Sequence, residues 1–286
     1  MRALAWTAGL SLVLFVRWQF DARYRAPLLR VGLISDRNVL AAATIGISTG
    51  IILSGSIYAL PEYLRGVFPN PLSATQAGQL LCVYALTAAA IRPLATWSIG
   101  KVGQRKAVAF ALTALVISMS LFARLLTTGT AITTYVAPLV IYAFCLTPLL
   151  SAAGGGTVAR VDQENQLDAV SIYMTFRQFG TSLGVALITI VLDRRTTLHS
   201  GRLFDHLRLG RPAVADWMSR ASGMLMGQGD LGAVDAAYAA YGVSREGAGR
   251  QAETLAYADP FLFMAAIGLA TFLLIPLMAP TPVRKP

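Results

Sequence analysis

An arginine and two glycines share one face of an apolar stretch that runs from residue 171 to residue 193. Gly180 and Gly184 are four residues apart and Arg177 precedes Gly180 by three, so the three lie on one side of a helix. Glycines at this spacing let helices approach closely, and a cation inside an apolar stretch is costly unless protein surrounds it. We therefore expect helix packing and gating from this face. Ligand contact and snorkelling to the membrane surface are the alternatives.

Arg92 lies late in another apolar stretch and is placed in the same packing and gating group, with an interface anchor as its alternative. Tyrosines in separate apolar stretches are candidates to line a substrate cavity. Aromatic, weakly polar walls suit bulky amphiphilic compounds, through stacking and cation–π attraction. Packing within the protein is the competing interpretation for each tyrosine. The cavity candidates are Ser48, Thr49, Tyr58, Tyr84 and Tyr142.

The polar residues are not arranged for catalysis or for metal binding. His199 and His206 lack the i, i+4 spacing of a helical zinc pair and have no cysteine nearby, so we interpret them as solvated. The three glycines at 154–156 lack the lysine and the hydroxyl residue of a phosphate loop. No serine, histidine and acid are placed for hydrolysis. We predict no enzyme activity, no metal and no cofactor.

Composition indicates a membrane protein. Of its 286 residues, 55% are hydrophobic and only 13% are charged, against about 25% charged in an ordinary soluble domain. Apolar runs near the ~20 residues of a membrane helix recur along the chain. The net charge of +10 comes largely from basic residues beside these runs, where they meet anionic lipid headgroups. Without a basic helix or an aromatic reading surface, we predict no nucleic-acid partner.

Local signals delimit the helices. Asp36 is placed to cap a span that ends before Pro61, and the sequence Ser73 to Gln76 has the capping-box pattern. Asp259 and Pro260 are typical of the first residues of a helix. The predicted organisation is a partial transmembrane linker helix at 1–17, a basic cytoplasmic linker at 18–37, five spans within 38–193, an extracytoplasmic loop with short amphipathic helices at 194–258, a last span at 259–280 and a cytoplasmic tail at 281–286.

Basic residues on alternate short loops predict the orientation. Five arginines between 17 and 37, three basic residues between 101 and 106, and two in the tail all fall on one side by helix parity. The opposite short loops carry little charge. The positive-inside rule therefore predicts a multi-pass protein of the cell membrane with its C-terminus in the cytoplasm.

Four stretches resemble the C-terminal half of a major facilitator superfamily transporter, more narrowly the fourteen-span drug:proton antiporters of the EmrB/QacA type. They are PLLRVGLISDRNVL, SIYALPEYLRGVF, FRQFGTSLGVALITIVLDRRTTLHSGRL and QAETLAYADPFLFMAAIGLA. GKVGQRKAVAF is similar to the family's cytoplasmic loop motif through Gly103, Arg105 and Lys106. Gly100 stands where the family has an acidic residue, so this sequence lacks the carboxylate of the motif's charge relay.

The resemblance implies an all-α, six-helix bundle made of two three-helix repeats and preceded by one partial linker span. It implies half of a proton-driven efflux transporter for small amphiphilic compounds, working by alternating access. The family's first half, which carries its proton-coupling acids, is not in this sequence, and no Asp or Glu lies deep in a predicted span. The implied partners are the lipid bilayer, a small amphiphilic substrate, and an N-terminal half or a second copy. A non-transporting scaffold or partner-binding fragment is the alternative.

Overall fold

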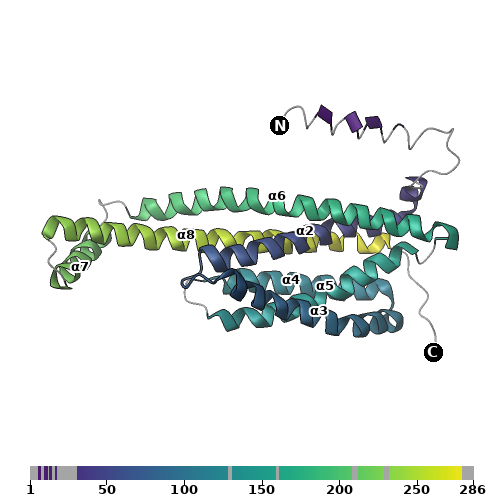
Figure 1. Ribbon diagram of the computed structural model, residues 1–286, viewed down its shortest axis with the longest axis horizontal. Coiled ribbons are helices and arrows are strands. Elements are labelled where there is room, and N and C mark those ends of the chain that lie inside the picture. The colour runs from purple at the N-terminus through teal and green to yellow at the C-terminus, as the bar shows by residue number, and fades with distance from the viewer. Residues whose placement is uncertain are drawn as a thin grey trace.

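The computed structural model describes residues 31–127, 131–158, 161–207, 212–228 and 232–278, with scattered residues between 6 and 17. Every regular element among these residues is helical, and six helices are long and apolar enough to cross a membrane (Figure 1). The chain is therefore an all-α polytopic membrane protein, as predicted. The predicted partial span at 1–17 and linker at 18–37 lie largely outside the described residues, and the tail at 281–286 lies wholly outside them.

The long helices differ in length. The spanning helices are α2 (Arg37–Gly66), α3 (Ala74–Val102), α4 (Gln104–Leu125), α5 (Val136–Val158), α6 (Gln166–His206) and α8 (Ala233–Phe272). Figure 1 shows α6 and α8 running side by side far beyond the other helices, with α7 (Pro212–Gln228) at the end of this projection. Short 3-10 helices complete the fold: η1 (Val31–Ser35), η2 (Ile132–Tyr135), η3 (Gln163–Asn165) and η4 (Ile275–Leu277).

Two predicted helix starts are confirmed. The carboxylate of Asp36 accepts hydrogen bonds from the backbone N–H groups of Asn38, at 2.7 Å, and Val39, at 3.3 Å, and so caps α2. Ser73 and Gln76 form both bonds of a capping box at the start of α3. These short side chains satisfy backbone donors that would otherwise have no partner at a helix end.

Two predicted helix ends and one predicted helix start are wrong. α2 continues through Pro61 to Gly66, and α6 continues through Asp193 to His206. Asp259 and Pro260 lie in the interior of α8, which begins at Ala233. A proline removes one helical hydrogen bond, but packing along the helix can offset that loss.

The packing that sustains α8 appears in its small buried residues. The region 194–258, predicted as a loop with short amphipathic helices, is instead mostly the continuation of α6 and the first half of α8, with α7 between them. α8 buries four alanines there, in two i, i+4 pairs that lie on different faces of the helix. Their small side chains let neighbouring helices lie close. The alanines are Ala236, Ala240, Ala252 and Ala256.

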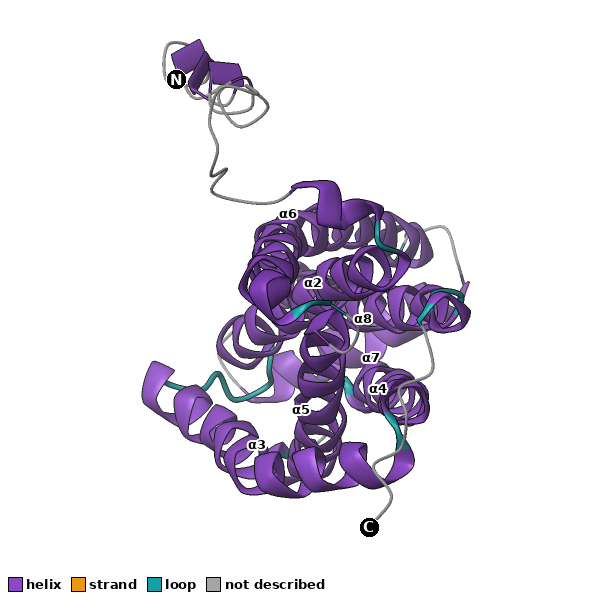
Figure 2. Cartoon of the chain, turned by 90° about the vertical axis from the view of Figure 1, so that its right-hand side faces the viewer, coloured by secondary structure: helices purple, strands orange, loops and turns teal. Residues whose placement is uncertain are grey.

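The spanning helices form two layers. Viewed end-on, α6, α2, α5 and α3 follow one another in a curved layer, which we call the front layer, and α8 and α4 lie beside α2 and α5 in a second layer (Figure 2). The stacked rings of Phe122 on α4 and Phe261 on α8, with centroids 5.2 Å apart, lie in the core between these elements. The two helices with the least buried surface are α3 and α6, at opposite ends of the front layer.

Neighbour relations repeat within this bundle. α2 packs against α6 and α8, and α5 packs in the same way against α3 and α4. If α2 is exchanged with α5, α3 with α6 and α4 with α8, the same pairs of neighbours result. The contact between α2 and α5 and the contact between α4 and α8 are unchanged by this exchange. One pair departs from the pattern, because α6 packs along α8 whereas α3 and α4 touch each other little.

Candidate functional site

A seam of glycines joins α2 to α6. A Cβ atom added to Gly180 would lie 2.7 Å from the Cα of Ile47, and one added to Gly184 would lie 2.6 Å from the carbonyl oxygen of Ile51. From the other side, a Cβ on Gly50 would lie 2.8 Å from the backbone nitrogen of Thr181. The two backbones are thus in direct contact, which only glycine permits at these positions. The seam holds α6, at one end of the front layer, against α2.

The seam also shows the direction of the two helices. Gly46 faces Tyr173, Gly50 faces the segment 177–181, and Gly55 faces Ile188. Residue numbers rise together on both sides, so α2 and α6 run parallel. This is the relation expected of the first and fifth spans in a chain that crosses the membrane at each helix.

Arg177 lies at the edge of the seam. Its carbonyl oxygen contacts Gly50 and accepts a hydrogen bond from the hydroxyl of Thr181 at 3.0 Å. Its guanidinium reaches only the Met174 sulfur, at 3.4 Å, and its buried Nε has no hydrogen-bond partner. No described carboxylate pairs with this cation. A buried donor left unpaired costs about 1–3 kcal/mol, so the side chain is suited to an acceptor from outside this bundle.

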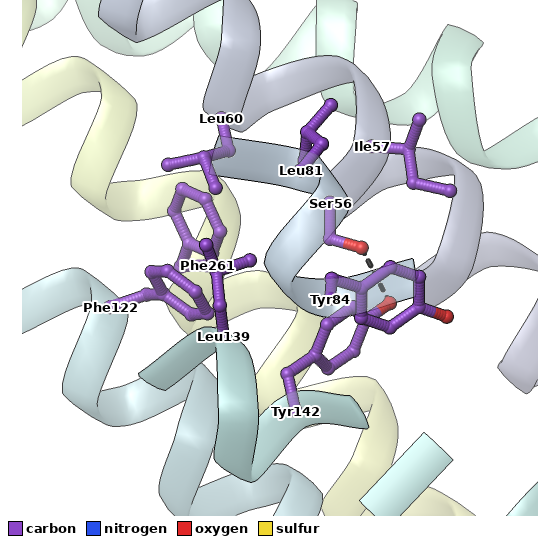
Figure 3. Close-up of a pocket in the computed structure, with 9 residues that line it drawn as sticks. All are labelled: Ser56, Ile57, Leu60, Leu81, Tyr84, Phe122, Leu139, Tyr142 and Phe261. Atoms are coloured by element: carbon purple, nitrogen blue, oxygen red, sulfur yellow. Dashed lines mark hydrogen bonds between the residues drawn. The ribbon is translucent and has the colours of Figure 1, made fainter. Parts of the chain in front are cut away.

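Two of the five predicted cavity residues do lie together. The rings of Tyr84 on α3 and Tyr142 on α5 stack with centroids 5.2 Å apart (Figure 3). The hydroxyl groups of Tyr142 and Ser56 are hydrogen-bonded at 2.5 Å between α5 and α2. The cavity beside them measures about 10 Å³ and has otherwise apolar walls. That volume admits one water molecule at most, so in this conformation the tyrosines fill the core rather than bind a bulky compound.

Tyr142→Phe is expected to destabilise the protein by about 1 kcal/mol, because it removes the buried hydroxyl that contacts Ser56 and the carbonyl of Ile52. The Ser56 hydroxyl, however, keeps its bond to the Leu53 carbonyl. Tyr84→Phe is the matched control, since the Tyr84 hydroxyl forms no hydrogen bond with a described residue. Thermal unfolding in detergent measures both variants. Equal losses from the two would show that the hydroxyl contact between α2 and α5 contributes nothing.

The structure does not bring the other predicted cavity residues to this place. Thr49 is fully buried, and its hydroxyl bonds to the carbonyls of Ile45 and Gly46 within its own helix. Ser48 is half-buried and bonds back to Thr44. Tyr58 is half-buried against the hydrophobic core. The common cavity predicted for these residues is therefore not present in this conformation.

The predicted loop motif forms a one-residue turn between α3 and α4. Gly103 has a φ of 86°, a region that residues with a Cβ rarely adopt. Arg105 and Lys106 follow it on the exposed surface of the first turn of α4. Arg92 is also exposed, on α3, where its backbone carbonyl accepts a hydrogen bond from the Thr96 hydroxyl at 3.1 Å and its guanidinium pairs with no described carboxylate.

His199 is not solvated as predicted. Its Nε2 lies 2.9 Å from a carboxylate oxygen of Asp259, and Arg195 lies 3.4 Å from the same oxygen. This group ties α6 to α8 where the two helices leave the rest of the bundle. Sequence reasoning missed the pair because its members are 60 positions apart, and because Asp259 was assigned to a helix start. The side chain of His206 lies outside the described residues.

The outward face of α6 carries a polar stripe that sequence reasoning also missed. Its exposed polar residues recur with a period of about 3.5, which places them in line along one side. Most of their hydroxyls bond to carbonyls of the same helix, but the amide of Gln178 has no partner among the described residues. The spacing alone would have revealed the stripe. Its members are Ser171, Thr175, Gln178, Ser182 and Thr189.

α3 also has an exposed face, made of small residues rather than the polar residues of α6. Its outward face is lined mostly by small residues three or four positions apart, with Arg92 in the one interval of seven, and small residues permit another helix to approach closely. Only 17% of the most apolar window of α3, and the same share of α6, is buried, against 67% for α2. These two helices are exchanged by the repeat described above. The small residues of α3 are Gly78, Cys82, Ala85, Ala89, Thr96 and Gly100.

No protein-family model matches this chain, and no curated protein resembles it at a significant level. The resemblance to major facilitator transporters therefore stays a prediction that rests on the sequence stretches quoted for it. The fold and the surfaces of the bundle are the independent observations that bear on function.

Proposed function

We propose that this bundle is one half of an alternating-access efflux transporter for small amphiphilic compounds, driven by protons, in the cell membrane. The observation that carries the proposal is the pair of uncovered helices at the edges of the front layer, α3 with its small residues and α6 with its polar stripe. A face with an unpaired amide is poorly suited to lipid tails, since hydrocarbon offers no hydrogen bond.

The repeat of helix contacts supports the same proposal. Transporters of the alternating-access kind are often built from three-helix repeats, with the substrate path between two six-helix bundles. Here the exchange of α2, α3 and α4 for α5, α6 and α8 relates the two uncovered helices to each other. The open surface is thus a symmetric feature of the bundle, as an interface with a second bundle would be. In this account the C-terminus and the turn at Gly103 are cytoplasmic, because of their basic residues.

The partner bundle must supply the carboxylate for proton coupling. In the described spanning helices the carboxylates of Glu62 and Asp259 lie toward helix ends or on the projection, and none lies beside Arg177. We assign proton coupling to a carboxylate of the partner, an N-terminal half or a second copy. Arg177 and the polar stripe of α6 would face that partner across the substrate path.

A thiol-labelling experiment tests this surface. In cells that produce the bundle with an N-terminal antiporter half, Ser182→Cys on the stripe is expected to react with a membrane-impermeant maleimide. Ile117→Cys on the exposed side of α4 is the control and should stay unreacted, because a thiol ionises and reacts in water but not in lipid. Both natural cysteines are first replaced by alanine. Position 182 remaining as unreactive as position 117 would mean that the stripe faces lipid, as the scaffold alternative requires.

A further inference from the structure

A groove opens on the outer side of the bundle between α3 and α4. Both helices pack along α5 but separate from each other above the turn at Gly103, so that Phe144 and Pro148 of α5 form the floor. The volume of the groove is about 560 Å³, within the range of small-molecule pockets. The helix pair equivalent to α3 and α4 in the repeat can be compared with them. The equivalent helices α6 and α8 are in contact, including where both extend beyond the bundle, whereas α3 and α4 touch each other little.

The groove is apolar along its length and cationic at one end. Its walls include the exposed side chains of Leu94, Val102 and Phe110. The hydroxyl of Ser98 donates a hydrogen bond to the carbonyl of Ala95 at 2.9 Å, so it does not need a polar partner from a bound molecule. Lys106 is the one charged residue of the lining. It lies where the groove meets the turn between α3 and α4.

The length of the groove matches one leaflet of a bilayer. Its lining on α3 extends from Ile91 to Val102, about 16 Å at ~1.5 Å per residue. Half of a hydrocarbon core of ~30 Å is about 15 Å. Trp97 and Lys101 mark the polar end, since the ammonium of Lys101 lies 4.2 Å from the centre of the Trp97 ring. A tryptophan beside a lysine is typical of the membrane–water interface.

The charge at this end has no counterpart among the residues that the structure describes. The sequence from residue 63 to residue 161 contains no Asp or Glu, so α3, α4 and α5 are entirely without carboxylates. Lys106 and Arg105 form no ion pair with any described residue. An anion that presents its charge at the interface and its apolar part to the membrane interior therefore complements both ends of the groove.

We propose that this groove binds one anionic phospholipid, with its phosphate at Lys106 and one acyl chain between α3 and α4. The groove lies on the opposite side of α3 from the small residues of its outward face, so the bound lipid leaves the surface proposed for a partner bundle free. The lipid fills this gap and holds α3 against α4. This proposal requires only that the chain spans a membrane, and does not rest on transport.

Fluorescence quenching in lipid nanodiscs tests the proposal. The full chain carries Phe110→Trp inside the groove as the only tryptophan, with Trp6, Trp18, Trp97 and Trp217 changed to Phe. Brominated-chain phosphatidylglycerol is expected to quench this reporter at about one fifth of the concentration needed for brominated phosphatidylcholine. Lys106→Gln should bring the ratio to within about twofold, and Arg124→Gln, at the other end of α4, should leave it unchanged.

A second reporter separates the groove from the general lipid surface. Ile117→Trp lies two turns further along α4, is exposed, and does not line the groove. It should show no preference for phosphatidylglycerol. Equal quenching of position 110 by the two lipids, a preference that survives Lys106→Gln, or the same preference at position 117 would each overturn the proposal. Lys106 is exposed and should not affect folding, and Arg105→Gln provides a second variant if it does.

Discussion

Gly180→Ala is expected to cause the largest loss of stability of any single methyl group added to this protein. The new Cβ would lie 2.7 Å from the Cα of Ile47, closer than carbon atoms approach without a bond. The obstacle is the backbone of α2, which cannot turn aside as a side chain can. α2 and α6 must therefore separate along the seam, and overpacking of this kind costs about 1–3 kcal/mol or more.

The chain offers a matched control for this prediction. Gly201 is on the same helix, and a Cβ added there meets no atom within 4 Å. Gly201→Ala should be neutral or slightly stabilising, because alanine favours helix more than glycine does. Thermal unfolding in detergent should show a marked fall in Tm for Gly180→Ala alone. A Tm unchanged from that of the natural protein would mean that α2 and α6 are not in backbone contact.

Arg177→Met is expected to separate stability from function. It keeps an unbranched apolar stem beside the seam but removes the buried Nε that has no hydrogen-bond partner. The isolated bundle should therefore be as stable as the natural protein, or more stable by up to about 1 kcal/mol. In the assembled transporter the same change removes the cation that faces the partner bundle, and the transport rate should fall at least tenfold.

Substrate affinity distinguishes the roles of Arg177. If the residue acts in conformational cycling, equilibrium binding of a fluorescent amphiphilic cation to the assembled transporter should change less than threefold in Arg177→Met. Arg177→Lys, which restores charge without the planar guanidinium, should recover only part of the transport rate. A large loss of substrate binding in a protein that folds normally would instead make Arg177 a binding residue.

Sequence reasoning was most accurate where the physical cause is local. Asp36 and the capping box at Ser73 act within three residues of themselves, and both caps are present. The four-residue spacing of Gly180 and Gly184 predicted close packing, because both residues need only share a helix face. What the spacing did not reveal is the other side of the seam, since Gly50 was not singled out as its counterpart.

Reasoning from local signals failed where packing across helices decides. Pro61 and the pair Asp259 and Pro260 are typical of helix ends, yet both lie within helices that neighbouring helices support. The bond between His199 and Asp259 depends on the pairing of two helices far apart in sequence. Tyr84 and Tyr142 were predicted to line a substrate cavity with three other residues, but the packed structure stacks their rings beside a cavity of only about 10 Å³.

The groove between α3 and α4 was beyond sequence reasoning for the same reason. Its lining residues are apolar and would fit either a core or a lipid surface. These residues line a groove only because α3 and α4 diverge from the one-residue turn that connects them. The absence of acidic residues from 63 to 161 was visible in the sequence, and it acquires meaning once Lys106 is placed at the end of that groove.

The central claim is that this bundle is half of a transporter, and proton-driven transport in proteoliposomes tests it most directly. Vesicles containing this chain alone are compared with vesicles that also contain an N-terminal antiporter half, under an imposed pH gradient and with a fluorescent amphiphilic cation as substrate. We predict movement of the substrate only when both halves are present. Transport by this chain alone would contradict the half-transporter account, and no transport in either case would favour the scaffold.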